Sequence, residues 1–239
     1  KAGLDVFEHA TRPRGRAEWN LETIEIDGTR RTVTCSTVLD RPFVKLQRFR
    51  REGCERRQDP KILLVAPLSG HYATLLRGTV AALLPDHDVF ITDWKDAREV
   101  PLSEGSFGVD DYIDELLRFM RHLGPDLHVM AVCQPAPLVL ASVAILAQAD
   151  DPAQPRSMIL MGGPVDTGRA PTAVTRFAES RPLSWFEHSV IAQVPAYYPG
   201  AGRSVYPGFF QIGSFISMNP SRHLESHLQM FHHLVRGDG

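Results

Sequence analysis

The chain has 239 residues, of which 26 are basic and 28 acidic, so its formal net charge at pH 7 is -2. This balance provides no bulk attraction to nucleic acid or to an anionic membrane. Hydrophobic residues make up 43% of the sequence, which is enough for one sizeable core, but no apolar run reaches the roughly 18 residues of a membrane span. We therefore expect a globular protein that binds no nucleic acid and has no membrane span.

The first twenty residues and the cysteines indicate the compartment. "KAGLDVFEHATRPRGRAEWN" lacks the basic start, apolar core and cleavage site of a secretory signal. The three cysteines, Cys35, Cys54 and Cys133, are odd in number and irregularly spaced. They predict neither a disulfide framework nor a zinc ribbon. Both features favour a cytoplasmic location, and no metal site is expected.

The chain first predicts antiparallel strands and then alternating strands and helices. Residues 21–50 alternate apolar and polar side chains around a turn signal at Asp27-Gly28. From "KILLVAP" at 61–67 onward, continuous apolar runs alternate with stretches of helical spacing. The later strands are expected at 88–94, 127–132 and 157–163, and the helices at "TLLRGTVAALLPD", "VDDYIDELLRFMRHLG" and the stretch after Cys133.

This order predicts an α/β fold, a mostly parallel, doubly wound sheet with an antiparallel N-terminal edge. Ligands of such sheets bind beyond the carboxyl ends of the strands, so functional residues are expected there. After residue 182 the alternation is lost, and aromatic, Pro and Gly residues prevail. We expect residues 1–182 to form the α/β core and residues 183–239 to form a cap or lid that ends in an amphipathic helix.

One cysteine lies where a strand meets a helix. Cys133 follows "HVMAV" and precedes "QPAP". At such a joint the turn exposes the side chain, the helix N-terminus favours a thiolate, and the next backbone N–H can face an oxyanion. Ala131 and Pro135 stand where the common G-x-S-x-G elbow has glycines; alanine is still small, and proline suits a first helical turn. A nucleophile and a buried structural thiol fit Cys133 about equally well, whereas Cys35 and Cys54 are expected to be structural.

Three segments together resemble a known family. "LLVAPLSGHYATLLRGTV", "VFITDWKDAREVPLSEGSFGVDDYI" and "HVMAVCQPAPLVLASVAIL" are similar, in this order, to segments of the intracellular polyhydroxyalkanoate (poly-3-hydroxybutyrate) depolymerases. These are α/β-hydrolase-fold enzymes with a Cys-Asp-His triad, and the resemblance extends over most of residues 3–239. It implies hydrolysis of polymer esters through a cysteine acyl-enzyme, without a cofactor, at the surface of storage granules in the cytoplasm.

The resemblance also implies roles for single residues. Cys133 matches the nucleophile, which favours the nucleophile over the structural thiol. The backbone N–H groups of Gln134 and Ser69 are the implied oxyanion donors, with Leu68 and Gly70 as neighbouring choices for the second. Asp93 is placed to line the site, but it fits an orienting or structural carboxylate better. The residues expected to contact substrate are His71, Asp93, Trp94, Tyr197 and Tyr198.

The other two triad members are not assigned within this chain. In this fold the acid and the histidine follow the nucleophile on late loops. We expect both downstream of Gly239, with the chain ending before the last strands of the sheet. His71 lies on the expected oxyanion loop and is a poor choice for the base. Asp238 lies too close to the final helix to be the acid.

Two further clusters favour ordinary structural roles. The histidines between 223 and 233 include an i, i+4 pair, but no acidic residue or cysteine completes a metal site. A helix with a polar histidine face and inward-packing Leu224, Leu228, Phe231 and Leu234 fits the spacing better. The basic stretch "RFRREGCERRQ" at 48–58 predicts a solvated loop.

Three functions remain open from the sequence. The first is the ester hydrolase. The second is a polyhydroxyalkanoate synthase-like acyltransferase, whose elbow is expected to keep glycine where this chain has Pro135. The third is a catalytically silent, granule-binding hydrolase fold. The preferred polymer side-chain length, the acceptor in the second step and the oligomeric state are not predicted.

Overall fold

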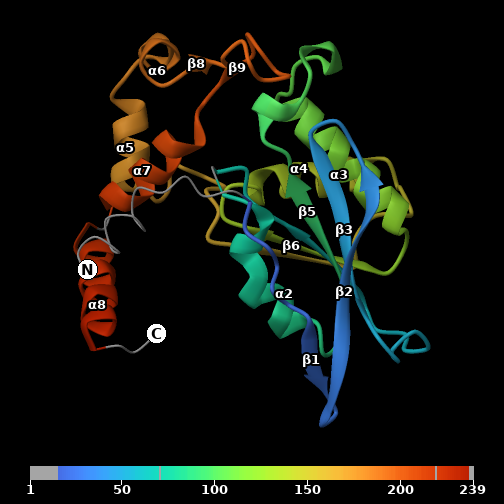
Figure 1. The fold of residues 1–239 in the computed structure, drawn as a ribbon. Coiled ribbons are helices and arrows are strands. Elements are labelled where there is room, and N and C mark those ends of the chain that lie inside the picture. The colour runs from blue at the N-terminus through green and yellow to red at the C-terminus, as the bar shows by residue number, and fades with distance from the viewer. Residues whose placement is uncertain (1–15, 70, 219, 237–239) are drawn as a thin grey trace.

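A seven-stranded mixed sheet forms the centre of the protein (Figure 1). The structure, a computed structural model, describes residues 16–69, 71–218 and 220–236. The strand order is β1-β2-β3-β5-β4-β6-β7. The strands are β1 (Thr23–Ile26), β2 (Thr29–Asp40), β3 (Val44–Arg51), β4 (Lys61–Val65), β5 (Asp88–Trp94), β6 (Leu127–Val132) and β7 (Ser157–Met161).

The strand directions agree with the predicted fold class. β1, β2 and β3 pair antiparallel, and β3 pairs antiparallel with β5. β5, β4, β6 and β7 are mutually parallel. An antiparallel N-terminal edge followed by parallel strands, with β4 between β5 and β6, is the sheet order of the α/β-hydrolase fold. The prediction of this fold is confirmed.

Local sequence explains the two kinds of strand. Asp27 and Gly28 both have positive φ, 50° and 72°, as the tight turn between β1 and β2 requires. In β4, Ile62, Leu63, Leu64 and Val65 are all buried, because helices cover both faces of the sheet. That double burial is why this strand is continuously apolar.

Helices pack on both faces of the sheet. η1 (Ala73–Leu76) and α2 (Arg77–Leu83) share one core cluster with inward residues of β4 and β5. α3 (Val109–Leu123) and α4 (Ala136–Gln148) share the other. The loop after β5 carries two short turns, η2 (Ala97–Glu99) and η3 (Leu102–Glu104). The predicted layered core is therefore present (Figure 1).

The chain beyond β7 lies beside the sheet (Figure 1). Tyr197 is 78% exposed and Phe209 70%, so these aromatic side chains are not ordinary core. The inward packing predicted for the final helix is wrong for Leu224, Leu228 and Phe231, which are exposed; the side chain of Leu234 lies outside the described residues. The elements are α5 (Ala173–Glu179), α6 (Leu183–Ser189), β8 (Ala192–Gln193), β9 (Ser204–Val205), α7 (Gly208–Met218) and α8 (Pro220–Arg236).

The β8–β9 hairpin is anchored on the loop after β5. The buried guanidinium of Arg203 donates to the carbonyl oxygens of Gly105 (2.5 Å), Pro101 (2.9 Å) and Val100 (3.2 Å). The Gly200 N–H donates to the Arg98 carbonyl at 2.8 Å. A Cβ on Gly200 would lie within 3.0 Å of three carbonyl oxygens of this loop, so only glycine allows the close approach.

Within the described part of the chain, none of the helices has both the length and the apolar character to cross a membrane.

Candidate active site

The joint between β6 and α4 is a sharp turn with Cys133 at its apex. Cys133 has φ 68°, a left-handed conformation that costs free energy for any residue with a side chain. Its N–H donates to the Met161 carbonyl of β7 at 2.7 Å, and its carbonyl accepts from the Ala136 N–H at 3.1 Å. The side chain is exposed. The strained turn therefore directs the thiol outward, as in a nucleophile elbow.

Small residues and prolines permit this geometry. A Cβ on Gly163 would lie 2.0 Å from the Ala136 Cβ and 2.6 Å from the Cys133 carbonyl oxygen, so the chain after β7 passes directly against the turn. Pro135 caps α4 with φ -73°, and Pro137 lies in the first helical turn. The prolines begin the helix, as predicted, because a first-turn residue has no intrahelical use for its N–H.

The loop after β4 is held next to this turn by buried hydrogen bonds. The Ala66 N–H donates to Thr92 Oγ1 at 2.9 Å. The Ala66 carbonyl accepts from Trp94 Nε1 at 2.9 Å and from the Tyr112 hydroxyl at 3.4 Å. Burial raises the pKa of Tyr112, so its hydroxyl keeps the donated proton. Three interactions thus fix the backbone two residues before Leu68.

A direct contact joins this loop to the elbow. The Leu68 N–H donates to Gln134 Oε1 at 2.7 Å, and both residues are exposed. Ser69 is buried, and its carbonyl contacts His71 Nδ1 at 3.1 Å. Because a carbonyl oxygen only accepts, this contact is a hydrogen bond in the tautomer of His71 that has a proton on Nδ1. Of the three predicted choices for the second donor, Leu68 faces the elbow residue Gln134, whereas Gly70 lies outside the described residues.

Asp93 and Trp94 lie beneath this loop. Both side chains are buried; Trp94 bonds the Ala66 carbonyl as described, and Asp93 forms an ion pair with Arg16. The Arg16 guanidinium also lies 5.7 Å from the centre of the Tyr72 ring. Trp94 therefore supports the loop, whereas Asp93 pairs with the chain before β1. The role of Arg16 was missed, since no local pattern marks an arginine that pairs with a residue 77 positions away.

Tyr197 and Tyr198 lie on the β8–β9 hairpin. The Tyr198 hydroxyl accepts a hydrogen bond from Arg98 at 3.3 Å, and the Arg98 guanidinium lies 4.9 Å from the ring centre. Tyr198 is therefore attached to the loop after β5. Tyr197 packs against Tyr198 with a centroid distance of 4.5 Å and remains open to solvent. Their predicted contact with substrate stays a prediction.

No metal site emerges from the described residues, which contain no group of three or more His, Cys, Asp or Glu able to hold an ion. The side chains of His223 and His227, the i, i+4 pair noted in the sequence, lie outside the described part. The acid and base of a triad likewise stay a prediction.

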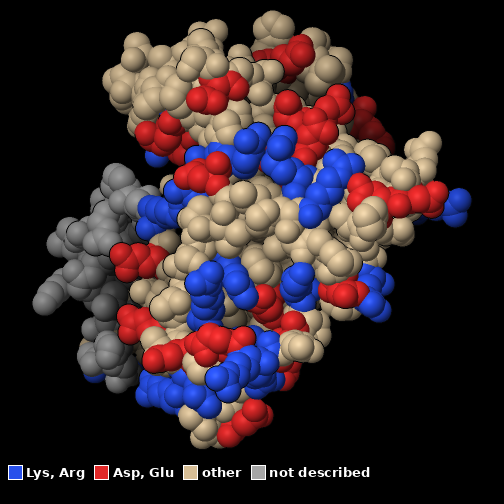
Figure 2. Space-filling model, turned by 90° about the vertical axis from the view of Figure 1, so that its right-hand side faces the viewer, with Lys and Arg blue, Asp and Glu red and all other residues tan. Residues whose placement is uncertain are grey.

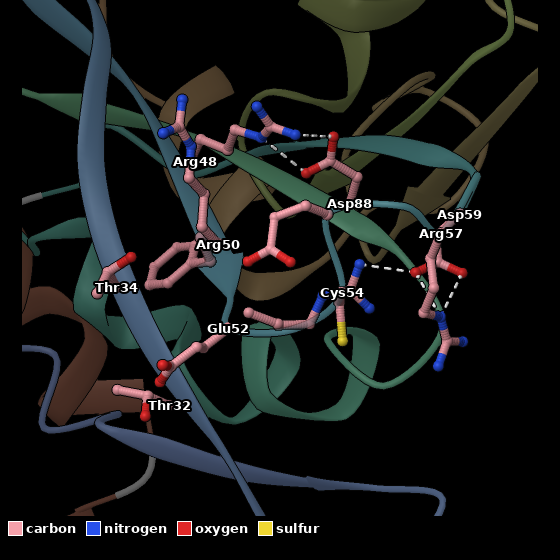
Figure 3. A pocket seen from close by; sticks show the side chains of 12 residues that line it. Thr32, Thr34, Arg48, Arg50, Glu52, Cys54, Arg57, Asp59 and Asp88 are labelled. Carbon is pink, nitrogen blue, oxygen red and sulfur yellow. Dashed lines mark hydrogen bonds and ion pairs between the residues drawn. The ribbon is translucent and has the colours of Figure 1, made fainter.

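A cavity of about 520 Å³ lies near the start of β5, at the end of the parallel strands opposite the elbow. Figure 3 shows its lining side chains. We call it the arginine pocket. Arg48 pairs with Asp88, the first residue of β5, at 2.9 Å, and the buried Arg51 pairs with Asp59 at 2.7 Å. Because β5 and β6 are both parallel to β4, a pocket at the start of β5 is remote from the thiol after β6. Its lining residues are Thr32, Thr34, Arg48, Phe49, Arg50, Arg51, Glu52, Cys54, Glu55, Arg57, Asp59 and Asp88.

The charges around this pocket are mixed. Arg57 pairs with both Asp27 and Asp59, and Figure 2 shows blue and red side chains interspersed over the visible face, with no single-sign surface. Arg48, Arg51 and Arg57 thus pair with nearby carboxylates. The prediction of a solvated loop at 48–58 is wrong for residues 48–51, which belong to β3 and include the buried Arg51.

Sheet order and elbow define an α/β-hydrolase. Residues 162–239 match the family model described as "PHB de-polymerase C-terminus". This stretch is similar to the PHB depolymerases, the chain has the α/β-hydrolase fold, and the resemblance noted in the sequence is confirmed.

Solved structures show more distant similarity. A mutant α/β-hydrolase from the metagenome of Lake Arreo, Spain, is 15% identical, with a TM-score of 0.45 over 74% of this chain and 61% of that one. Brefeldin A esterase, a bacterial homologue of human hormone-sensitive lipase, is 16% identical, with a TM-score of 0.43 over 74% and 51%. An esterase from Rhizomucor miehei is 13% identical, with a TM-score of 0.44 over 62% and 48%.

The chain spans between about half and three fifths of the length of these three proteins. A search of curated protein sequences finds no significant match to it.

Proposed function

We propose that the whole protein hydrolyses ester bonds of polyhydroxyalkanoate, with Cys133 as the nucleophile. The observation that carries the proposal is the exposed thiol of Cys133 at φ 68° between β6 and α4. A strained, outward-directed side chain at a strand-to-helix turn is the position of the nucleophile in this fold. The match of residues 162–239 to the PHB depolymerase family model supports a polyester as the substrate class.

The reaction follows from the groups around the elbow. The Cys133 thiolate attacks the ester carbonyl carbon, and a carbon–sulfur bond forms while the carbonyl oxygen becomes an oxyanion. The Gln134 N–H and an N–H of the loop after β4 donate to that oxyanion. The carbon–oxygen ester bond then breaks, and the departing oxygen takes a proton to become a free hydroxyl end. Water attacks the thioester, which releases the acid and restores the thiol.

Proton transfer requires a base near the thiol. We propose that a histidine oriented by an aspartate, both from outside the described residues, accepts the Cys133 proton and returns it to the leaving hydroxyl. The N-terminus of the 13-residue helix α4 directly follows the elbow, and its dipole favours the thiolate. The main chain around Cys133 thus supports the nucleophile, whereas the proposed pair supplies the proton route.

The segment beyond β7 supports a water-insoluble substrate. Three aromatic residues of this segment are exposed: Tyr197 by 78%, Phe209 by 70% and Trp185 by 37%. Covering such groups with an apolar polymer chain is favourable. We propose that this segment, residues 183–239, is a lid that contacts the polymer at granules in the cytoplasm.

Replacement of Cys133 tests the proposal. In the full-length protein, Cys133→Ala should lower the release of 3-hydroxybutyrate from amorphous poly-3-hydroxybutyrate by about a thousandfold or more, because loss of a nucleophile removes the acyl-enzyme route. Cys54→Ala, at a buried thiol of the arginine pocket, is the matched control and should retain the rate per folded molecule. Mass spectrometry after rapid acid quenching should find the acyl group on Cys133. Undiminished release by Cys133→Ala contradicts the proposal.

A further inference from the structure

The side chain of Gln134 occupies a position that the reaction needs. Its Oε1 lies 2.7 Å from the Leu68 nitrogen and accepts the N–H. Donors of an oxyanion hole lie 2.7–3.1 Å from the oxygen they stabilise. Oε1 is an sp² carbonyl oxygen, like the oxygen of an ester carbonyl. In this structure, therefore, an oxygen of the protein itself occupies the hydrogen-bonding position in front of the Leu68 N–H.

The two partners of this hydrogen bond differ in freedom. The backbone before Leu68 is fixed by the three buried hydrogen bonds at Ala66, to Thr92, Trp94 and Tyr112. Gln134 lies on the exposed turn ahead of α4, and its side chain has three rotatable bonds. A ligand that competes for the Leu68 N–H will therefore displace the Gln134 side chain rather than the loop.

We propose that the Gln134 side chain is a latch on the oxyanion hole: its carboxamide oxygen holds the Leu68 N–H until a substrate carbonyl oxygen displaces it. The inference rests on the proposed function, since an ester is the displacing group. It assigns the second oxyanion donor to Leu68 and gives Gln134 two separate roles. Its backbone N–H is the first donor, and its side chain is a specificity-determining competitor that only a well-placed carbonyl replaces.

The latch has a measurable cost for substrate binding. The ester must break one hydrogen bond to form an equivalent one, so the free energy of that bond is subtracted from the binding of substrate. Gln134→Met keeps the length of the side chain but has no strong acceptor, and KM for a soluble 3-hydroxybutyrate oligomer should fall about three- to tenfold. Gln148→Met, at an exposed glutamine at the other end of α4, is the control and should leave KM unchanged.

The opposite substitution should strengthen the latch. In Gln134→Glu a carboxylate accepts the Leu68 N–H more strongly than an amide does, and its charge opposes the developing oxyanion. The value of kcat/KM should fall about tenfold or more at neutral pH and should recover as the pH falls and the carboxyl group is protonated. If Gln134 only holds the loop in place, both results should differ. Gln134→Met should then lower kcat instead of KM, and Gln134→Glu should not recover kcat/KM as the pH falls.

Hydrogen exchange at the Leu68 amide separates the latch from the function. In the full-length wild-type protein this amide should exchange slowly, and in Gln134→Met at least about tenfold faster; Gln134→Ala repeats the test if the first variant is unstable. If ester hydrolysis proceeds while both variants leave KM and Leu68 exchange unchanged, the latch is wrong and the proposed function stands. If exchange accelerates but the wild type releases no 3-hydroxybutyrate, an ester is not the displacing group and the proposal is overturned together with the function.

Discussion

The arginine pocket and the elbow lie at opposite ends of the parallel strands, and they hold their polar groups in different ways. At the arginine pocket, guanidinium groups face carboxylates at short distance, as in Arg51 with Asp59 and Arg48 with Asp88. At the elbow, a residue with a side chain adopts a left-handed backbone conformation, and an N–H of the neighbouring loop bonds a glutamine side chain. In the pocket, most of the charges are already paired with one another. The proposed nucleophile thus lies where the backbone is strained and not among the paired charges of the arginine pocket.

The largest expected difference between the elbow and the arginine pocket is in the reactivity of their thiols. With iodoacetamide at pH 7.5, Cys133 should be alkylated at least about a hundredfold faster than Cys54, which is buried in the arginine pocket. Cys35 is a second comparison: the residue is exposed overall, but partial burial of its thiol raises the pKa from 9.0 to about 11, partly opposed by Arg16. Its alkylation should therefore rise about tenfold for each pH unit up to about 11, because only the thiolate reacts.

Peptide mass spectrometry over a time course measures all three rates in one sample. Equal alkylation rates for Cys133 and Cys54 would contradict the inference that the elbow presents an accessible, reactive thiol.

Close packing at the elbow should make it sensitive to a single added carbon. Gly163→Ala would place a Cβ 2.0 Å from the Ala136 Cβ, so we expect a loss of about 3 kcal/mol in the free energy of unfolding, together with slower ester hydrolysis. Gly78→Ala, in α2, is the matched control. Its added Cβ meets nothing within 4 Å, and it should stabilise the helix by about 0.5–1 kcal/mol.

Urea titrations of both glycine variants give these differences. A Gly163→Ala protein as stable as the wild type would show that the elbow can relax.

The arginine pocket should affect stability without affecting catalysis. Asp59→Asn removes the charge that faces the buried Arg51, although the Arg51 guanidinium keeps the carbonyl oxygens of Leu84 and Pro85. We expect a loss of about 2 kcal/mol in the free energy of unfolding, less than for a fully buried pair with no other partner. Asp27→Asn, at the exposed partner of Arg57, should cost less than about 0.5 kcal/mol.

Thermal unfolding measures the effect of each variant on stability, and the hydrolysis rate per folded molecule measures its effect on catalysis. A tenfold fall in that rate for Asp59→Asn would mean that the pocket communicates with the elbow.

Much of the fold follows from the sequence because its signals are local. Apolar runs such as 61–67 predict doubly covered strands, and the change to helical spacing predicts the helices between them. The elbow could be predicted for the same reason, since Cys133 lies between a strand pattern and two prolines that begin a helix.

Contacts between distant segments could not be predicted in this way. The hydrogen bond from Leu68 to Gln134 joins residues 66 positions apart, and it exists because β4 and β6 are neighbours in the sheet. The ion pair of Arg16 with Asp93 joins residues 77 positions apart, so no local pattern marks it either. For α8, periodicity predicts an apolar stripe but not which surface covers it, which is why Leu224 and Leu228 were expected inside and are exposed.

The anchor of the β8–β9 hairpin has a consequence for acid conditions. Arg203 is held by main-chain carbonyl oxygens, and neither a guanidinium nor a carbonyl oxygen changes its protonation at any pH a cell encounters. On acidification the hairpin should therefore keep its hold on the loop after β5.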